Sequence, residues 1–130
     1  MIVVDASAIL AIVLKEPEAE RLEAALVAAG EGLMSPVNYW EVLTRAWGQF
    51  GAAGPVAAKA VMSRLDVRVA DIGSDQADEA ALAFERFGKR GGGRLNLGDC
   101  FAYALADREG DGLLFKGDDF PNTDVKSVLP

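Results

Sequence analysis

The hydrophobic positions of the chain follow two patterns. Short continuous apolar runs, rich in β-branched residues, are typical of buried strands. Longer stretches in which apolar residues recur every three or four positions are typical of helices that bury one face. The short runs predict strands at residues 2–4, 32–35, 67–72 and 112–116, the third with a wetter face, and a short strand or tail at 124–129. The periodic stretches predict helices at residues 8–14, 16–30, 36–50, 56–65, 74–88 and 97–109.

Strands that alternate with helices predict an α/β fold with a mostly parallel sheet. The chain has 130 residues, of which 51% are hydrophobic and 25% charged, as expected for one folded domain with a real core. Neither a linker nor an internal repeat divides the sequence. We therefore expect a single domain that covers residues 1–130.

The helix predicted at residues 36–50 carries large apolar side chains on one face. Such a stripe is typical of a helix that packs into the core or against another subunit. Its members are Val37, Trp40, Leu43, Trp47 and Phe50.

The composition excludes several kinds of site. Histidine is absent, so no Ser-His-Asp triad, Cys-His pair or His-ligated zinc is possible. Cys100 is the only cysteine, which rules out an intrachain disulfide and favours a small apolar role in a reducing compartment. No signal-peptide pattern and no apolar run of about 18 residues occur, so a cytoplasmic protein is expected. The net charge of −7 argues against a general nucleic-acid coat protein but suits a basic protein partner.

Acidic residues stand where predicted strands end or helices begin. Asp5 follows the first strand, Glu41 lies early in the helix after the second strand, and Asp99 opens the helix at 97–109. Asp118 and Asp119 follow the strand at 112–116. In parallel α/β sheets, ligands bind beyond the carboxyl ends of the strands. These carboxylates are therefore expected to meet at one edge of the sheet.

Four converging carboxylates repel one another. At about 4 Å and an effective dielectric constant of 20, each pair of like charges costs about 4 kcal/mol. Such a cluster persists only when a cation neutralises it or when some members are protonated. Oxygen ligands without His or Cys favour Mg²⁺ or Mn²⁺, and carboxylate-bound metals of this kind support phosphodiester hydrolysis.

Each acid also has an ordinary structural explanation. Asp5 can cap a helix, and Glu41 can pair with Arg45 one turn later. Asp99 suits the positive end of its helix, and acids such as Asp118 and Asp119 are common in turns.

A basic, glycine-rich loop precedes Asp99 and is expected to be flexible. Arg94 is the cation of this loop nearest to Asp99 and the best candidate for a phosphate contact, with Lys116 as the second candidate. A solvated loop without function fits the same pattern. The loop covers residues 89–94, and its glycines are residues 91–93. Four cations lie in or just before it, namely Arg86, Lys89, Arg90 and Arg94.

Several segments together resemble the PIN-domain ribonucleases, specifically the VapC toxins of toxin–antitoxin pairs. The first is VVDASA at residues 3–8, followed by Glu41 in its helix. The most specific is LNLGDCFAYALA at residues 95–106, and the last is LLFKGDDF at 113–120 with Thr-Asp at 123–124. The match covers nearly the whole chain.

The resemblance implies a PIN-like three-layer α/β/α fold and a toxic endoribonuclease that depends on Mg²⁺, with Mn²⁺ as a substitute. Asp5 and Asp99 would ligate the metal directly, and Glu41 would complete the site. Asp119, rather than Asp118, would be the fourth acid.

The resemblance also implies that the Ser7 hydroxyl supports the metal site or a phosphate. The implied partners are an RNA substrate (tRNA, rRNA or mRNA) and a VapB-like antitoxin that blocks the site, with no membrane partner. The implied assembly is a homodimer, or a heterotetramer or octamer with the antitoxin.

Two other functions compete with the nuclease. Asp5 could accept a phosphoryl group, as in haloacid-dehalogenase-like phosphatases. Those enzymes usually carry a second acid two residues later, where this chain has Ser7. A non-enzymatic, receiver-like acidic module that binds metal would fit an early Asp, but it leaves Glu41 and the basic loop unexplained.

Overall fold

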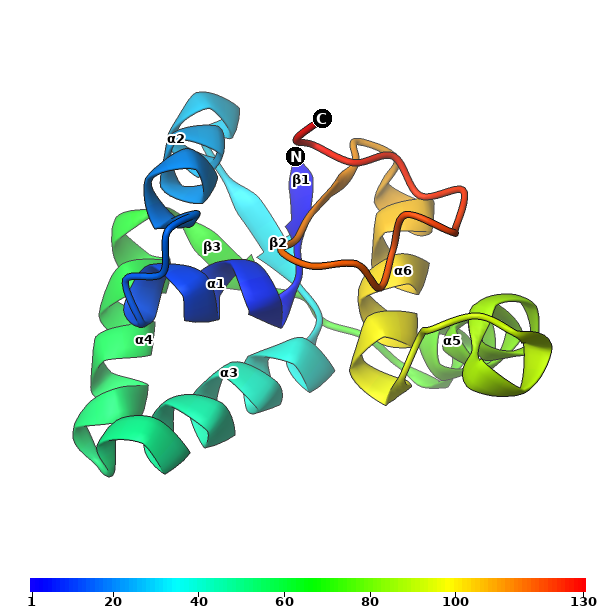
Figure 1. The fold of residues 1–130 in the computed structure, drawn as a ribbon, viewed down its shortest axis with the longest axis horizontal. Coiled ribbons are helices and arrows are strands. Elements are labelled where there is room, and N and C mark those ends of the chain that lie inside the picture. Colours follow the sequence, from blue (N-terminus) through cyan, green and yellow to red (C-terminus); the bar gives the residue numbers. More distant parts are fainter.

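A small parallel sheet forms the centre of the protein. The computed structural model describes all 130 residues. Its strands lie in the order β3-β2-β1-β4, and every neighbouring pair is parallel (Figure 1). Val3 of β1 lies opposite Leu33 on one side and Leu113 on the other. The strands are β1 (Ile2–Val4), β2 (Gly32–Met34), β3 (Val67–Val69) and β4 (Leu113–Leu114).

Helices cover both faces of this sheet. The helices α1 to α4 lie on one side, and α5 and α6 lie on the other (Figure 1). None of them has the length and apolar composition that crossing a membrane requires. Their bounds are α1 (Ala6–Val13), α2 (Ala19–Ala29), α3 (Pro36–Phe50), α4 (Ala53–Arg64), α5 (Ser74–Phe87) and α6 (Leu97–Glu109), with a short 3₁₀ turn, η1 (Lys89–Gly91).

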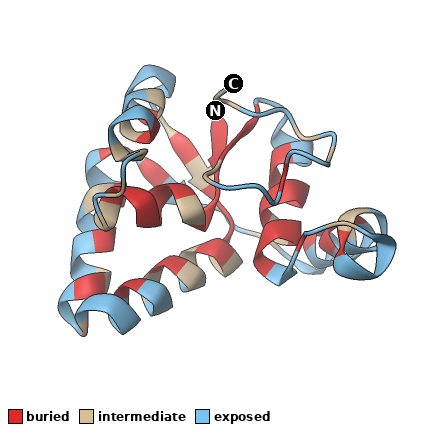
Figure 2. Cartoon of the chain, viewed as in Figure 1, coloured by how far each residue is buried: buried red, intermediate tan, exposed pale blue.

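Alternation along the strands divides the core into two. Val4 and Leu114 pack with α1 to α4, whereas Val3 and Leu113 pack with α5 and α6. Because successive strand residues point to opposite faces, one short strand supplies both layers. Figure 2 shows β1, β4 and most of α6 as buried, with exposed residues on the outer helices. The predicted three-layer α/β/α arrangement is confirmed.

Four predicted strands are shorter in the structure or absent from it. The second ends at Met34, because Ser35 caps α3. The edge strand β3 ends at Val69, because its only neighbour, β2, ends at Met34. The last strand stops at Leu114, opposite Val4, where β1 itself ends. Residues 124–129 form no strand, and only Ser127 makes an isolated bridge, to Leu113. The basic loop that was expected to be flexible contains the η1 turn.

The aromatic stripe of α3 is not part of the core. The exposed fractions of Trp40, Trp47 and Phe50 are 65%, 61% and 49%. The buried residues of this helix are instead Asn38, Val42 and Ala46, which recur every four positions. These shorter side chains allow α3 to approach α1, α4 and α6. The face of α3 that is buried is therefore determined by close packing against these helices and not by which face carries the largest apolar side chains. The alternative of a subunit interface on the aromatic face stays a prediction.

Gly54 marks the closest approach between α3 and α4. A Cβ atom at this position would lie only 2.0 Å from the carbonyl oxygen of Ala46. We expect Gly54→Ala to lower the free energy of unfolding by about 1–3 kcal/mol, because the two helices must move apart. Gly48→Ala is the matched control, since nothing lies within 4 Å of a Cβ there. It should instead raise stability by about 0.5–1 kcal/mol, since glycine weakens a helix interior. Urea unfolding of both variants tests the pair, and equal effects would contradict this packing.

Candidate active site

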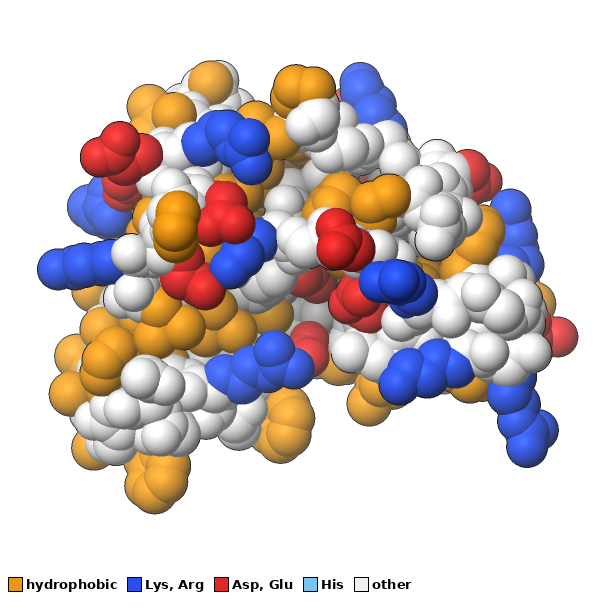
Figure 3. All heavy atoms as spheres, viewed as in Figure 1, with side chains coloured by type: hydrophobic (Ala, Val, Ile, Leu, Met, Phe, Trp, Pro, Cys, Tyr) orange, Lys and Arg blue, Asp and Glu red, His pale blue; other side chains and the backbone are white.

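The first turns of three helices converge at the carboxyl edge of the sheet. The starts of α1, α3 and α6 face one another below the ends of β1 and β4 (Figure 1). In the space-filling view, acidic side chains gather in a central hollow, and basic side chains stand on both sides of it (Figure 3). The hollow lies where the strand-end rule predicted a ligand site.

Asp5 is both a helix cap and a buried acid. Its Oδ2 atom accepts a hydrogen bond from the Ser7 amide at 3.1 Å, which caps α1. Only 5% of the residue is exposed. Burial raises the pKa of Asp5 to about 6, and the nearby charge of Glu41 adds to this rise while hydrogen bonds from Ser7 oppose it. The interpretation of Asp5 as a helix cap is therefore compatible with its interpretation as a site residue.

Asp99 is fixed by a capping box at the start of α6. The Asn96 amide donates to Asp99 Oδ2 at 3.1 Å, and the Asp99 amide donates back to Asn96 Oδ1 at 2.9 Å. Burial raises the pKa of Asp99 to about 7, and the charges of Asp5 and Asp119 act in the same direction. Burial of the neighbouring Cys100, together with the charge of Asp99, raises the pKa of the Cys100 thiol to about 11. Cys100 is therefore an inert thiol in the core.

Glu41 is held by a residue that the sequence did not single out. The buried Asn38 side chain donates from Nδ2 to Glu41 Oε1 and to the Gly98 carbonyl, both at 2.9 Å. A Cβ atom at Gly98 would lie 2.1 Å from Glu41 Oε1, so a larger residue there would displace this carboxylate from its present position. The pairing of Glu41 with Arg45 is longer, at 3.8 Å. An amide three residues before Glu41 on the same helix face was the only available sequence signal.

The fourth acid lies in the exposed turn after β4. Asp118 and Asp119 are both exposed. Asp119 raises the pKa of Asp99 through its charge and a side-chain hydrogen bond. The charge of Glu41 thus acts on Asp5, and the charges of Asp5 and Asp119 act on Asp99. The choice of Asp119 as the fourth acid stays a prediction.

The donor set fits a hard divalent cation. Every candidate ligand is a carboxylate oxygen, as Mg²⁺ and Mn²⁺ prefer. As they lie, no three acidic side chains surround one point closely enough to hold an ion. Asp5 and Asp99 each use Oδ2 for a capping hydrogen bond, which leaves Oδ1 of each carboxylate outside the helix cap. The repulsion among these acids is what a cation would relieve.

The candidate substrate cations differ in their surroundings. Arg94 is exposed and forms no ion pair. Lys116 is engaged, because its ammonium group donates to Glu16 at 2.8 Å and lies 3.8 Å from Glu18. A phosphate at Lys116 would therefore compete with two carboxylates.

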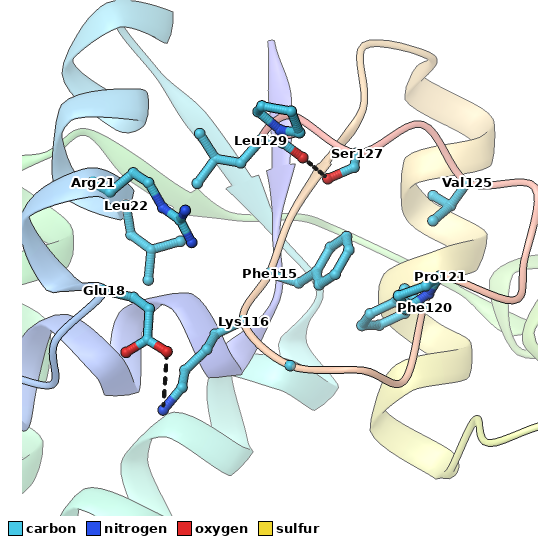
Figure 4. Close-up of a pocket in the computed structure, with 12 residues that line it drawn as sticks. Glu18, Arg21, Leu22, Phe115, Lys116, Phe120, Pro121, Val125, Ser127 and Leu129 are labelled. Atoms are coloured by element: carbon cyan, nitrogen blue, oxygen red, sulfur yellow. Dashed lines mark hydrogen bonds and ion pairs between the residues drawn. The ribbon is translucent and has the colours of Figure 1, made fainter.

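Ser7 and Lys116 connect two parts of the site. The Lys116 amide donates to the Ser7 hydroxyl at 2.9 Å, so Ser7 ties the start of α1 to the segment after β4. Lys116 also lines a cavity of about 470 Å³ between α2 and the C-terminal segment (Figure 4). In Figure 4 the unpaired guanidinium group of Arg21 points into this cavity.

Sequence similarity decides the family. A family model for the PIN domain matches residues 2–126. The chain is 42% identical to VapC ribonuclease Mb0640 of Mycobacterium bovis, over 97% of both chains. It is also 42% identical to ribonuclease VapC of Mycolicibacterium smegmatis, over 97% of this chain and 98% of the relative. The chain belongs to the VapC members of the PIN-domain family.

Solved structures share the fold of this VapC family member. VapC20 of Mycobacterium tuberculosis, a Sarcin-Ricin loop cleaving toxin, superposes with a TM-score of 0.71 at 21% identity, over 93% of this chain and 92% of that one. A toxin–antitoxin complex from Klebsiella pneumoniae gives a TM-score of 0.70 at 17% identity, over 95% and 93%. The PIN-like fold expected from the sequence is thereby confirmed.

The raised pKa values predict how the stability of the metal-free protein changes with pH. Asp5 and Asp99 hold their protons to about pH 6 and 7 when folded, whereas unfolded Asp releases its proton near pH 4. The folded state binds more protons between these limits, so the free energy of unfolding falls as the pH rises from about 4 to about 7. The loss from Asp5 alone is about 3 kcal/mol. In EDTA, we expect a lower melting temperature at pH 8 than at pH 5.5.

Asp99→Asn is the control for this pH dependence. An amide cannot ionise, so the variant should lose much of the decline and melt higher than the wild type at pH 8 in EDTA. Added Mg²⁺ should stabilise the wild type more at pH 8, where the carboxylates are charged. The same melting temperature for the wild type at both pH values would contradict the assigned burial.

Proposed function

We propose that this VapC protein is a toxic endoribonuclease that hydrolyses RNA phosphodiester bonds with Mg²⁺. The observation that carries the proposal is the burial of Asp5 and Asp99 beside Glu41 and Asp119, a like-charge cluster that a cation would neutralise once its members are ionised. Its relatives at 42% identity are named VapC ribonucleases. Family membership favours the nuclease over the phospho-aspartate and receiver-like alternatives.

The residues of the site would divide the work. Asp5 and Asp99 would hold the metal, which when bound supplies the positive charge that activates water and stabilises a phosphoryl oxygen. Glu41, kept in place by Asn38, would orient the attacking water and accept its proton. Asp119 would complete the cluster from the exposed turn. Mn²⁺ would serve as a substitute, since it prefers the same ligands.

Substrate binding would rely on charge outside the cluster. Arg94 is free to contact an RNA phosphate, whereas Lys116 would first have to leave Glu16. The Ser7 hydroxyl would stiffen the site through its bonds to neighbouring backbone and carboxylate groups.

The protein partners would use surfaces away from the hollow as well as the acidic site itself. A groove of about 670 Å³ between α1, α2 and α4 has apolar walls that include Ile12, Val13 and Val61, which suits a helix of a VapB-like antitoxin. The net charge of −7 favours a basic inhibitory segment at the acidic site. The exposed aromatic face of α3 would join two copies in a homodimer, or in larger complexes with the antitoxin, in the cytoplasm.

Cleavage should require Asp99. In Asp99→Asn, a neutral amide replaces a charged ligand, so we expect RNA cleavage to fall by more than about 100-fold while the fold is kept. Asp78→Asn removes the same charge from an exposed position on α5 and should leave cleavage unchanged. The assay uses purified, antitoxin-free protein with Mg²⁺, Mn²⁺ or EDTA. Normal turnover by folded Asp99→Asn protein, or cleavage that persists in EDTA, would contradict the proposal.

Arg94 should contribute to RNA affinity through charge. In Arg94→Ala, RNA binding should weaken, and the slope of log affinity against log salt should fall by about 0.7, the value for one lost contact to a single strand. Lys59→Ala, on the outer helix α4, removes an equal exposed charge and should keep the wild-type slope. Binding is measured with the Asp99→Asn background to prevent cleavage. Identical slopes for all proteins would assign Arg94 to the solvated surface.

A further inference from the structure

The turn that carries Asp119 receives no support from the sheet. The strand β4 ends at Leu114, and residues 117–124 contain neither helix nor strand. Asp119 itself is exposed, although Phe120 beside it is 2% exposed and packs against Phe115 with ring centroids 4.9 Å apart. Thr123 closes the turn, since its hydroxyl and amide both donate to the Phe120 carbonyl, at 2.7 and 2.9 Å. The Phe120 ring therefore anchors one point of the turn, and a second contact is needed to fix the orientation of the turn relative to Asp99.

Asp124, at the end of this turn, is bound from two helices. The Tyr103 hydroxyl of α6 donates to Asp124 Oδ1. Arg86 of α5 donates to Asp124 Oδ2 at 3.3 Å and to the Tyr103 hydroxyl at 3.4 Å. In Figure 1 the C-terminal segment passes beside α6. We name the contact between Tyr103 and Asp124 the tyrosine latch.

The tyrosine bond is the stronger part of this arrangement. The side chains of Arg86 and Asp124 are each 59% exposed, and ion pairs at such positions contribute little. Tyr103 is only 4% exposed, and its ring packs against Phe87 with centroids 5.2 Å apart. A fixed phenol that donates to a carboxylate makes a short, charge-assisted hydrogen bond. Tyr103 is therefore the rigid side of the latch.

Tyr103 and Asp99 lie on the same face of one helix. They are four residues apart in α6, so they are neighbours one turn apart. The helix that presents the buried acid thus also presents the donor that anchors the turn bearing Asp119. The buried Phe120 ring holds the middle of the turn on the core, and the latch holds its far end to the helix that carries Asp99.

We propose that Tyr103 and Asp124 are positioning residues that hold Asp119 at the metal site through the tyrosine latch. The inference rests on the proposed function, because Asp119 matters here as a member of the metal-binding cluster. In this role neither residue would bind the metal or RNA itself. Without the latch, the turn would be held only by the Phe120 ring, so Asp119 would be less well positioned and would offer Mg²⁺ a weaker contact.

The test compares the two tyrosines of the chain. Tyr103→Phe keeps the buried ring and removes the latch hydroxyl, whereas Tyr39→Phe removes a hydroxyl that makes no hydrogen bond. We expect Tyr103→Phe to weaken Mg²⁺ binding by about 10-fold or more, as measured by calorimetry, since partners that orient ligands typically contribute 10–100-fold. Cleavage should recover at high Mg²⁺, with the KM for RNA unchanged. Tyr39→Phe should match the wild type.

A double-variant cycle separates positioning from general damage. In an Asp119→Asn background, Tyr103→Phe should cause no further loss of Mg²⁺ affinity, because the residue to be positioned is already changed. Asp124 provides a second pair of variants that leaves the core intact. Asp124→Ala should act like Tyr103→Phe, and Asp124→Asn, which keeps an oxygen acceptor for Tyr103, should lose less.

The outcomes distinguish this inference from the proposed function. If the wild type binds Mg²⁺ and cleaves RNA while Tyr103→Phe and Asp124→Ala bind Mg²⁺ equally well, the latch is overturned and the nuclease stands. The latch would also be overturned if the losses of Mg²⁺ affinity caused by Tyr103→Phe and Asp119→Asn were fully additive in the double variant. If the wild type neither binds Mg²⁺ nor cleaves RNA, both are overturned.

Discussion

Repulsion among carboxylates at one edge of the sheet is the constraint on which the rest of the site depends. Parallel topology forces the ends of β1 and β4 to the same edge, where α1, α3 and α6 begin. The positive ends of these helices and their amides offset part of the negative charge. The cost of burying a charged carboxylate is larger than this stabilisation, because the pKa values of Asp5 and Asp99 are raised to about 6 and about 7. The fold therefore brings together more negative charge than the surrounding groups can neutralise, and protons or a cation must supply the rest.

The local capping interactions belong to the site rather than compete with it. A cap explains why an acid follows β1, but it does not explain why that acid is buried beside three others. Asp5 and Asp99 each give one oxygen to a backbone amide, which fixes the direction of the carboxylate. Helix capping therefore orients these side chains before any ligand binds. An acid that caps a helix can for this reason also be a functional residue.

The sequence predicted what depends on local pattern and missed what depends on distant contacts. The bounds of β1, α3 and α6 follow from periodicity and caps, and the ends of the strands located Asp5 and the turn with Asp119. The buried face of α3 could not be predicted, because the close approach at Gly54 chooses small side chains over tryptophans. Asn38, which binds Glu41, also donates a hydrogen bond to Gly98, 60 residues after Asn38. Lys116 donates to Glu16, which lies 100 residues before it. No local pattern contains such pairings.

The four acids are supported to very different degrees. Asp5 and Asp99 are fixed by helix starts, and Glu41 is fixed by a buried amide that also binds the neighbouring helix. Only Asp119 lies on an exposed turn, and its support comes from side chains instead of backbone ladders. Under the proposed function, an RNA strand would enter where the hollow is open, beside the exposed turn that carries Asp119. An acid carried by a turn and anchored from α6 keeps the edge open while its distance from Asp99 stays defined.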